Sequence, residues 1–187
     1  MMGTRTEGER KVVIFCSASY DIEPKFNQAA REVVRAACSL GYTIVSGGAV
    51  KGTMGVVADE TAACGGFHVG VLPRFMSVYH HPALNETIWT DTMSARKEKM
   101  REGTCAAIAL PGGIGTLDEL VETLTLAKLD IYKGRVIAFN LDGFFDPFIA
   151  LLDHYVRTGM LDPGSRDLVS FPSSVAELTE LLKQPVK

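Results

Sequence analysis

The sequence lacks any long hydrophobic run and any strong excess of one charge. Its 187 residues carry a formal net charge of −3 at pH 7, so no strong positive field attracts nucleic acid or an anionic membrane surface. No apolar stretch is long enough to cross a bilayer as a helix. Residues 1–10 are polar and charged, without the hydrophobic segment of a signal peptide. We therefore expect a cytoplasmic protein with no nucleic-acid or membrane partner, and a flexible N-terminus over residues 1–10.

Cysteine and histidine are scarce and scattered. The chain has four of each, and none forms a C-x-x-C pair or stands at the spacing of zinc ligands. Three of the cysteines stand in apolar surroundings, where a free cysteine behaves as a small hydrophobic residue. We expect no metal site and no redox cofactor. We also expect four reduced cysteines that serve packing: Cys16, Cys38, Cys64 and Cys105.

The sequence does contain a regular alternation of strand and helix patterns. Hydrophobic residues make up 47% of the chain, which is enough for one domain with a large core. Short apolar runs, typical of buried parallel strands, occupy residues 11–16, 42–45, 68–72, 106–110 and 135–140, with shorter candidates at 86–90 and 167–171. Segments with helical spacing lie between and after them, at 24–41, 55–64, 92–103, 116–129, 144–157 and 173–182. This alternation predicts one doubly wound, Rossmann-like α/β domain over residues 1–187 with a central parallel sheet.

A glycine loop follows the predicted strand at 106–110 and leads directly into a helix. Its glycines allow a ligand to approach the main chain closely. The unpaired N–H groups of the first helical turn favour an anion. The segment therefore predicts a phosphate site, with a cradle made by Gly112, Gly113, Gly115 and Thr116.

Two glutamates follow the cradle on the same predicted helix. Glu119 and Glu122 continue the three-residue spacing that starts at Thr116, so the three side chains share one face. Carboxylates beside a phosphate are an odd choice for binding alone, because anion would face anion. This favours a catalytic Glu119 over a residue that merely complements the helix dipole, the role that fits Asp118. Glu122 either supports Glu119 and holds ribose hydroxyls or is a solvated helix residue, and both interpretations stay open.

Other polar and glycine positions follow strands of the same predicted sheet. Ligands of open α/β sheets bind outside the carboxyl ends of the strands, where Ser17 either offers its hydroxyl to a ligand or caps the turn. The loop at 46–55, SGGAVKGTMG, has neither the dinucleotide fingerprint nor the P-loop spacing. Its Gly47 and Gly48 either line a ligand cleft or serve a tight turn and close helix packing.

Cationic residues crowd the predicted helix at 92–103. Arg96 and Lys97 either lean toward the phosphate cradle or belong to a solvated face. The planar guanidinium of Arg96 suits bidentate contacts that a lysine cannot copy. The irregular segment 74–85 comes earlier in the chain, and a loop of that length is often a lid or a partner contact.

Three motifs in this order resemble those of one family, the LONELY GUY (LOG) cytokinin riboside 5′-monophosphate phosphoribohydrolases, long labelled lysine decarboxylase-like. The likeness runs from Val12 to about Leu161. The family signature P-G-G-x-G-T-x-x-E is matched by Pro111, Gly112, Gly113, Gly115, Thr116 and Glu119. A methionine followed by an Arg-Lys pair is matched by Met93, Arg96 and Lys97. The motif G-G-x-x-x-G-x-M-G is matched by Gly47, Gly48, Gly52, Met54 and Gly55.

The resemblance implies a Rossmann-type homodimer that cleaves the N-glycosidic bond of a nucleoside 5′-monophosphate to a free base and ribose 5-phosphate. It makes Arg96 and Glu119 the catalytic residues and implies no cofactor. Glu119 would stabilise an oxocarbenium-like state and orient or deprotonate the attacking water. The expected substrate-binding residues are Ser17, Gly47, Gly48, Met93, Lys97, Gly112, Gly113, Gly115, Thr116 and Glu122.

Two other functions fit the sequence less well. A decarboxylase would need pyridoxal phosphate on a Schiff-base lysine, whereas Lys97, Lys99 and Lys128 lie on predicted helix faces. A non-catalytic carrier of a nucleotide or of molybdenum cofactor would need the phosphate cradle but not a paired Arg96 and Glu119. Their joint presence favours the hydrolase over the carrier.

The chain departs from the family pattern at three places near these motifs. The usual M-H-E-R-K has Ser94 and Ala95 in place of His and Glu, and Ala49 replaces a glycine of the second loop. Residues 125–132 read TLAKLDIY where family members often read T-W-A-Q-L-G-I-H. These changes concern the choice between adenine and N6-isoprenylated adenine more than the type of reaction.

Overall fold

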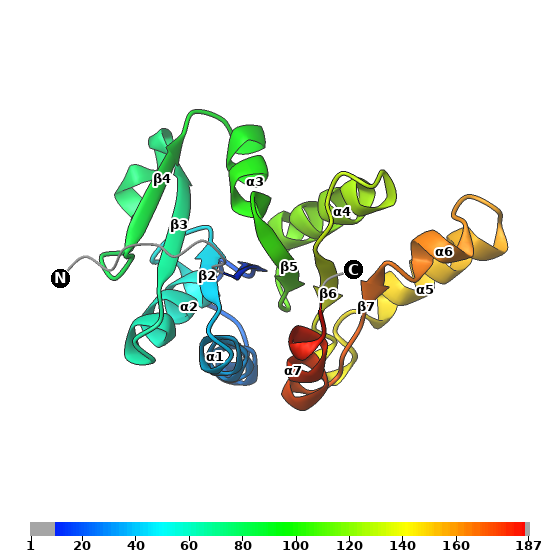
Figure 1. Cartoon of the computed structure of the whole chain (residues 1–187), viewed down its shortest axis with the longest axis horizontal. Coiled ribbons are helices and arrows are strands. Elements are labelled where there is room, and N and C mark those ends of the chain that lie inside the picture. Colours follow the sequence, from blue (N-terminus) through cyan, green and yellow to red (C-terminus); the bar gives the residue numbers. More distant parts are fainter. Residues whose placement is uncertain (1–9, 186–187) are drawn as a thin grey trace.

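A seven-stranded, all-parallel sheet forms the centre of the molecule (Figure 1). The computed structural model describes residues 10–185. The expectation of a flexible N-terminus concerns residues 1–10, of which 1–9 lie outside the described part. The strands are β1 (Lys11–Phe15), β2 (Thr43–Ser46), β3 (His68–Pro73), β4 (Glu86–Thr90), β5 (Thr104–Ala109), β6 (Arg135–Ala138) and β7 (Val169–Ser170). Their order is β4-β3-β2-β1-β5-β6-β7, which reverses at β1 and β5 and leaves a crevice outside their carboxyl ends. The predicted doubly wound, Rossmann-like α/β fold is confirmed.

Helices cover both faces of this sheet (Figure 1). One face carries α1 (Pro24–Ser39), α2 (Gly52–Ala63) and α7 (Val175–Lys183). The other carries α3 (Met93–Arg101), α4 (Ile114–Lys128) and α5 (Asp146–Arg157). Shorter helical segments are η1 (Arg74–Tyr79), η2 (Leu141–Gly143) and α6 (Pro163–Arg166). Among residues 10–185, no helix combines the length and apolar character needed to span a membrane.

The boundaries of some helices differ from those predicted. α2 begins at Gly52 rather than at residue 55, because the Met54 N–H donates to the carbonyl oxygen of Ser17 at 3.3 Å and so pairs a group of the first turn. α6 was not predicted, since it is a single turn stabilised by Asp162, whose carboxylate accepts from the Ser165 N–H at 2.8 Å. Neither hydrogen bond can be recognised from the hydrophobic periodicity of the sequence.

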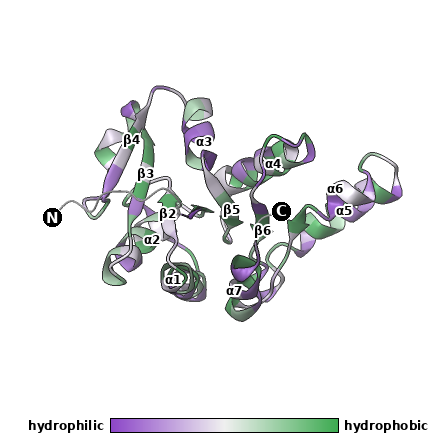
Figure 2. Cartoon of the chain, in the orientation of Figure 1, coloured by the Kyte–Doolittle hydropathy of each residue, from purple (hydrophilic) through white to green (hydrophobic). Residues whose placement is uncertain are grey.

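Alternate residues of each strand feed two separate cores. Val12, Ile14 and Ile108 point toward α1, whereas Val13 and Phe15 point toward α3 and α4, as the two-residue period of a strand requires. Figure 2 shows the hydrophobic residues on the sheet and hydrophilic ones on α3 and on outer helix faces. Because both faces are covered, the strands read as unbroken apolar runs in the sequence.

The cysteines are free thiols in three kinds of surroundings. Cys16 is buried, and Cys38 and Cys105 are half-buried against the core on the α1 side. Cys64 is exposed at the end of α2, so the packing role predicted for it is wrong. Its apolar neighbours Ala62 and Ala63 are exposed as well, because the last turn of α2 leaves these small side chains in solvent while Val57 and Ala58 form the buried side.

One histidine is buried in the sheet, on the strand next to the edge strand β4. His68, at the start of β3, is fully buried, and its Nε2 lies 2.8 Å from Ser46 Oγ of β2. Its Nδ1 has no hydrogen-bond partner among the described residues. Burial, helped by the nearby His81, lowers the pKa of His68 from its ordinary value of 6.5 to about 4. The imidazole is therefore neutral in the folded protein at neutral pH.

Replacement of His68 by valine should make the protein more tolerant of acid. Between pH 6.5 and about 4 the unfolded chain binds a proton at His68 that the folded protein does not, so folded stability falls as the pH falls through this window. The loss reaches at most roughly 3 kcal/mol, at 1.36 kcal/mol per pKa unit. Urea unfolding of wild type and His68→Val at pH 7 and pH 4 measures the difference. Parallel losses of stability in the two proteins would contradict the assignment.

Candidate active site

A cavity of about 340 Å3 opens at the carboxyl ends of β1 and β5. The loop after β1, the first turns of α2, α3 and α4, and η1 all contribute to its wall. Three methionines, Met54, Met76 and Met93, are among the apolar residues of the wall, and Arg96 and Glu119 are among the charged ones. The cavity lies where the strand order reverses, the usual ligand position in open α/β sheets.

The first turn of α4 faces this cavity. Gly113 is the N-cap residue, and no side chain caps the helix, so the first N–H groups and the positive end of the dipole are free to meet an anion. A Cβ atom added at Gly113 or Gly115 would have no other atom within 4 Å, whereas one at Gly112 would overlap Thr116 Oγ1. Gly112 therefore allows close packing against Thr116, and the other two glycines leave room beside the helix end.

Arg96 and Glu119 form a buried ion pair across the cavity. The Arg96 Nη1 donates to Glu119 Oε1 at 2.9 Å, and the Arg96 Nε donates to the carbonyl oxygen of Val71 at 3.0 Å. Each of the two residues is only 8% exposed. Burial raises the pKa of the Glu119 carboxyl above its ordinary value, against the opposing effect of Arg96. Such a carboxyl is better suited to accept a proton than an exposed glutamate.

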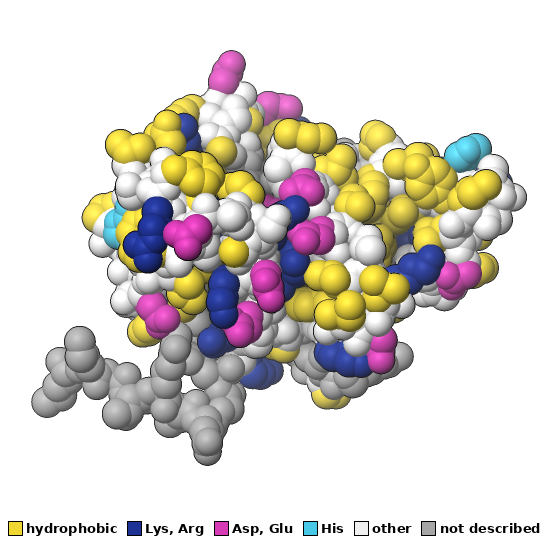
Figure 3. Space-filling model, turned by 90° about the horizontal axis from the view of Figure 1, so that it is seen from above, with side chains coloured by type: hydrophobic (Ala, Val, Ile, Leu, Met, Phe, Trp, Pro, Cys, Tyr) yellow, Lys and Arg dark blue, Asp and Glu magenta, His cyan; other side chains and the backbone are white. Residues whose placement is uncertain are grey.

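More exposed ion pairs continue this contact between α3 and α4. The Lys97 Nζ lies 2.9 Å from both Asp118 Oδ2 and Glu122 Oε2, and the Arg101 Nη1 lies 3.1 Å from Glu122 Oε2. Partial burial works against ionisation of Glu122, but Lys97 and Arg101 outweigh it and lower its pKa. In Figure 3 basic and acidic side chains alternate in the middle of the face seen from above. These partly exposed pairs join the outer surfaces of the two helices that carry Arg96 and Glu119.

The other predicted substrate-binding residues divide into two groups. Ser17 and Met93 line the cavity, although Ser17 Oγ also accepts from the Ser19 N–H at 3.0 Å and so caps the turn. Gly47 lies behind the site, where an added Cβ would overlap Arg96 Nη2, and Gly48 adopts a φ of 65° against Leu72. Neither glycine lines the cavity: Gly47 packs against Arg96 and Gly48 against Leu72. Their predicted contact with substrate stays a prediction.

Glu122 also lies outside the lining of the cavity. Its carboxylate is engaged by Lys97 and Arg101, which favours the helix-surface interpretation over contact with the ribose. Lys97 lines the cavity but is paired with Asp118 and Glu122. It therefore contributes charge to the site while its own position is fixed by the helix pair.

Sequence reasoning missed several residues of the cavity wall, among them Cys16, Met54 and Met76. Cys16 was assigned to packing, yet it borders the cavity, and its burial raises the pKa of the thiol so that it stays neutral beside Glu119. Met54 was noted only as part of a motif, and Met76 only as part of the irregular segment 74–85. The presence of methionines in the segments that follow β2 and β3 was the one available signal, and it is weak because methionine fills cores equally well.

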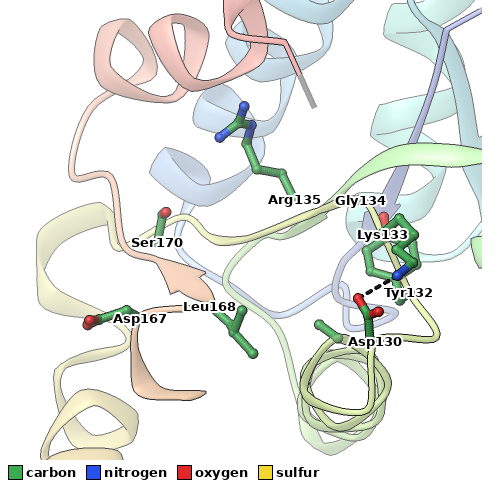
Figure 4. A pocket seen from close by; sticks show the side chains of 9 residues that line it. Asp130, Tyr132, Lys133, Gly134, Arg135, Asp167, Leu168 and Ser170 are labelled. Atoms are coloured by element: carbon green, nitrogen blue, oxygen red, sulfur yellow. Dashed lines mark ion pairs between the residues drawn. The ribbon is translucent and has the colours of Figure 1, made fainter. Parts of the chain in front are cut away.

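A second cavity, of about 310 Å3, lies near the amino end of β6 (Figure 4). Its Lys133 Nζ is 2.5 Å from Asp130 Oδ1. The Arg135 Nη2 donates to the carbonyl oxygens of Gln184 and Pro185 at 3.3 and 2.7 Å. Both cations are thus engaged by the protein itself, so the cavity at the carboxyl ends is the better candidate for a functional site.

The fold and the cavity define a Rossmann-like α/β protein with a charged site at the carboxyl edge of its sheet. The family model described as "Possible lysine decarboxylase" matches residues 54–182. The chain is 32% identical over 187 residues to the cytokinin riboside 5′-monophosphate phosphoribohydrolase LOG of Oryza sativa subsp. japonica, which covers 98% of this chain and 77% of that protein. The chain therefore belongs to the LOG family.

Two further proteins show how far the similarity extends. The cytokinin riboside 5′-monophosphate phosphoribohydrolase of Mycobacterium tuberculosis is 38% identical over 159 residues, which is 83% of this chain and 84% of that protein. Among solved structures, the molybdenum cofactor carrier protein MCP of Chlamydomonas reinhardtii matches with a TM-score of 0.73 and 21% identity, over 94% of this chain and 97% of that one. At that identity the likeness shows the fold alone.

One departure from the family pattern coincides with a left-handed backbone conformation. Asp130 stands where family members often have glycine, and its φ is 61°. The left-handed region favours glycine, but aspartate tolerates it better than most other residues. The ion pair with Lys133 accompanies this conformation. The substitution is thus absorbed locally, outside the lining of the cavity at the carboxyl ends.

Alanine at Gly112 and at Gly115 should have opposite effects on stability. Gly112→Ala forces the buried Thr116 side chain to move, at a cost of about 1–3 kcal/mol typical of overpacking. The melting temperature should fall by roughly 2 °C or more. Gly115→Ala meets open space in the first turn of α4, so its melting temperature should be equal to or above that of wild type. Calorimetry of the two variants measures this, and equal destabilisation would contradict the geometry.

Proposed function

We propose that the protein hydrolyses the N-glycosidic bond of a nucleoside 5′-monophosphate, AMP or an N6-substituted cytokinin riboside monophosphate, to a free base and ribose 5-phosphate. The observation that carries this proposal is the buried Arg96–Glu119 pair in the same cavity as the uncapped start of α4. Membership of the LOG family supports it. We also propose that the chain forms one domain and that the protein is cytoplasmic.

In the proposed reaction the C1′–N bond breaks and its electron pair leaves with the base. Positive charge grows on the ribose, and the Glu119 carboxylate stabilises it and takes a proton from the attacking water. The oxygen of that water forms the new bond to C1′, and the proton taken by Glu119 passes to the departing base, which restores the carboxylate. The raised pKa of Glu119 brings the carboxyl nearer to the pH at which a general base works best.

Arg96 holds Glu119 and has further donors for the substrate. Its guanidinium carries five N–H groups, and the bonds to Glu119 and Val71 engage Nη1 and Nε. The remaining N–H groups can contact the ribose or the leaving base. We assign Arg96 the orientation of the substrate, which a planar, always charged group performs better than a lysine.

The phosphate of the substrate is assigned to the start of α4. The N–H groups around Gly113 and Gly115 and the hydroxyl of Thr116 would hold its oxygens, with Lys97 adding positive charge. In this arrangement the base lies against the methionines of the opposite wall. Thioether side chains are polarisable and adaptable, so this wall accepts a flat purine and leaves open whether N6 is substituted.

A non-catalytic carrier is the rival function. A carrier needs the anion site at the start of α4 but has no need of a buried arginine–carboxylate pair beside it. Removing two charged groups from water is unfavourable unless their geometry is good. The retention of Arg96 and Glu119 at 8% exposure each therefore favours hydrolysis.

The variant Glu119→Gln should lose nearly all activity while it remains folded. Glutamine keeps the shape and an acceptor for Arg96 but does not take a proton, so release of base should fall ~10²–10⁴-fold. The matched control is Glu122→Gln, one turn further along α4 and outside the cavity lining, whose rate should stay close to that of wild type.

The assay follows free base by chromatography with AMP and with N6-isopentenyl-AMP as substrates. The ratio of the two rates for wild type identifies the preferred base. Equal activity of wild type and Glu119→Gln, or an equal loss in Glu122→Gln, would contradict the assignment of Glu119. Tight binding of both nucleotides by wild type without release of base would favour the carrier.

We also propose that a second copy of the chain covers the apolar face of α4 and α5. Six large hydrophobic side chains there are between 37% and 83% exposed: Ile114, Leu117, Val121, Phe144, Leu151 and Tyr155. Two apolar grooves, of about 260 and 460 Å3, run along this face, and Figure 3 shows hydrophobic side chains gathered on the side of α4 and α5. An apolar face of this kind on a soluble chain is commonly buried in a two-fold dimer.

A charge in this face should separate the copies. Leu151→Glu, at a side chain that borders both grooves, should shift the mass seen in sedimentation equilibrium from dimer to monomer. Leu129→Glu is the control, because Leu129 is 60% exposed and borders neither groove. A Leu151→Glu protein with the same mass as wild type would exclude this face as the dimer contact.

A further inference from the structure

A buried hydrogen-bonded pair lies beneath the glycine loop that follows β2. His68 stands in register with Ile44, and Ser46 is the next residue of β2 on the same face of the sheet. Both side chains are fully buried, with Ser46 Oγ 2.8 Å from His68 Nε2. Ser46 Oγ also accepts from the backbone N–H of Gly48 at 3.1 Å. The pair therefore connects the interior of the sheet to the backbone of the loop.

The surrounding hydrogen bonds indicate whether Ser46 or His68 donates in this pair. If Ser46 donates to Nε2 of His68, the proton of the imidazole lies on Nδ1, and one buried group stays unpaired. If Nε2 donates instead, both Nδ1 and the Ser46 hydroxyl proton lack a partner among the described residues. The first arrangement leaves fewer buried groups unsatisfied and is favoured. Ser46 then donates to His68 and accepts from Gly48 at the same time.

The loop held in this way is the one that supports Arg96. A Cβ atom added at Gly47 would overlap Arg96 Nη2, so the backbone of Gly47 lies in close contact with the guanidinium. The Gly48 carbonyl oxygen accepts from the His81 N–H at 3.0 Å, which fixes the next peptide unit of the loop. The position of Gly47 is thus set by bonds on either side of Gly48.

A buried histidine lowers the stability of the folded protein at this position. A strand buried on both faces is normally built from valine, isoleucine and leucine, and a valine at residue 68 would leave no orphan nitrogen in the core. A buried polar group that lacks one partner costs stability. Among the described residues the imidazole of His68 bonds only Ser46. The other hydrogen bonds of His68 are made by its backbone, including that from its N–H to Asn85 Oδ1, and any residue could make them. What the imidazole adds is a fixed acceptor for Ser46.

We propose that Ser46 and His68 are positioning residues, which hold the loop Gly47–Gly48 against the guanidinium of Arg96 and thereby set the geometry of the Arg96–Glu119 pair. The expected effect on kcat rests on the proposed hydrolase function, whereas the expected effect on the position of Arg96 does not. The pair acts on the substrate only through Arg96, since neither residue borders the cavity. Small displacements of an orienting group can reduce a rate by as much as about 10²-fold.

The test compares Ser46→Ala, His68→Val and the double variant with wild type. The control is Thr61→Val, which removes another fully buried hydroxyl, on α2, that bonds the carbonyl oxygen of Val57 and has no bond to the loop. Two readouts are needed. The first is kcat and KM for AMP, and the second is the 15N NMR signal of the Arg96 Nε–H and of the Gly48 amide without nucleotide.

Each single variant should shift both NMR signals and lower kcat about tenfold or more, with KM within about threefold of wild type. The double variant should be no worse than the singles, because the two residues act as one unit. Thr61→Val should change neither readout. Melting temperatures of all four variants, measured at the same pH, separate a loss of position from a loss of fold.

Two results would overturn the inference. One is an unmoved Arg96 signal in Ser46→Ala and His68→Val, and the other is an unaltered kcat in an active protein. If wild type itself releases no base from AMP, the proposed function fails, and the Arg96 signal alone then decides whether the pair positions the guanidinium. If His68→Val fails to fold, Ser46→Ala, a smaller change, decides in its place.

Discussion

The buried ion pair between Arg96 and Glu119 is the interaction on which the site depends. It joins α3 to α4 across the crevice between the two halves of the sheet, at 2.9 Å and with each residue 8% exposed. Such a pair offsets its loss of hydration only when its geometry is held firmly. Val71 bonds the guanidinium from below, Gly47 packs against it, and Lys97 pairs with Asp118 at the rim. The surrounding structure therefore serves to hold one arginine and one carboxylate in place beside the anion-binding end of a helix.

Much of the fold follows from local sequence patterns. The strands appear as short apolar runs because both faces of a parallel sheet are covered, and the glycine loop before α4 marks the end of β5 at the expected place. The two-residue period of a strand predicts which of its residues share a face. It does not reveal that the start of α2 is fixed by Ser17, since that bond joins segments that are distant in sequence.

The site is less accessible from the sequence than the fold. Motif spacing brings Arg96, Glu119 and the α4 glycines together, and the structure places them around one cavity. It does not distinguish Gly115, beside open space, from Gly47, which packs behind Arg96. Nor does motif spacing show that the Glu122 carboxylate is paired with Lys97 and Arg101. These differences depend on how two helices and a loop meet in space, and no periodicity in any one segment records them.

The most direct test of a hydrolytic Arg96–Glu119 centre is 31P NMR of AMP mixed with an equimolar amount of protein. The account predicts that the phosphorus signal of AMP disappears and is replaced, one for one, by that of ribose 5-phosphate. The phosphate ester itself stays intact throughout, because the bond that breaks is at C1′. An AMP signal that is shifted or broadened by binding, yet undiminished over hours, would contradict the account and indicate a protein that only binds its nucleotide.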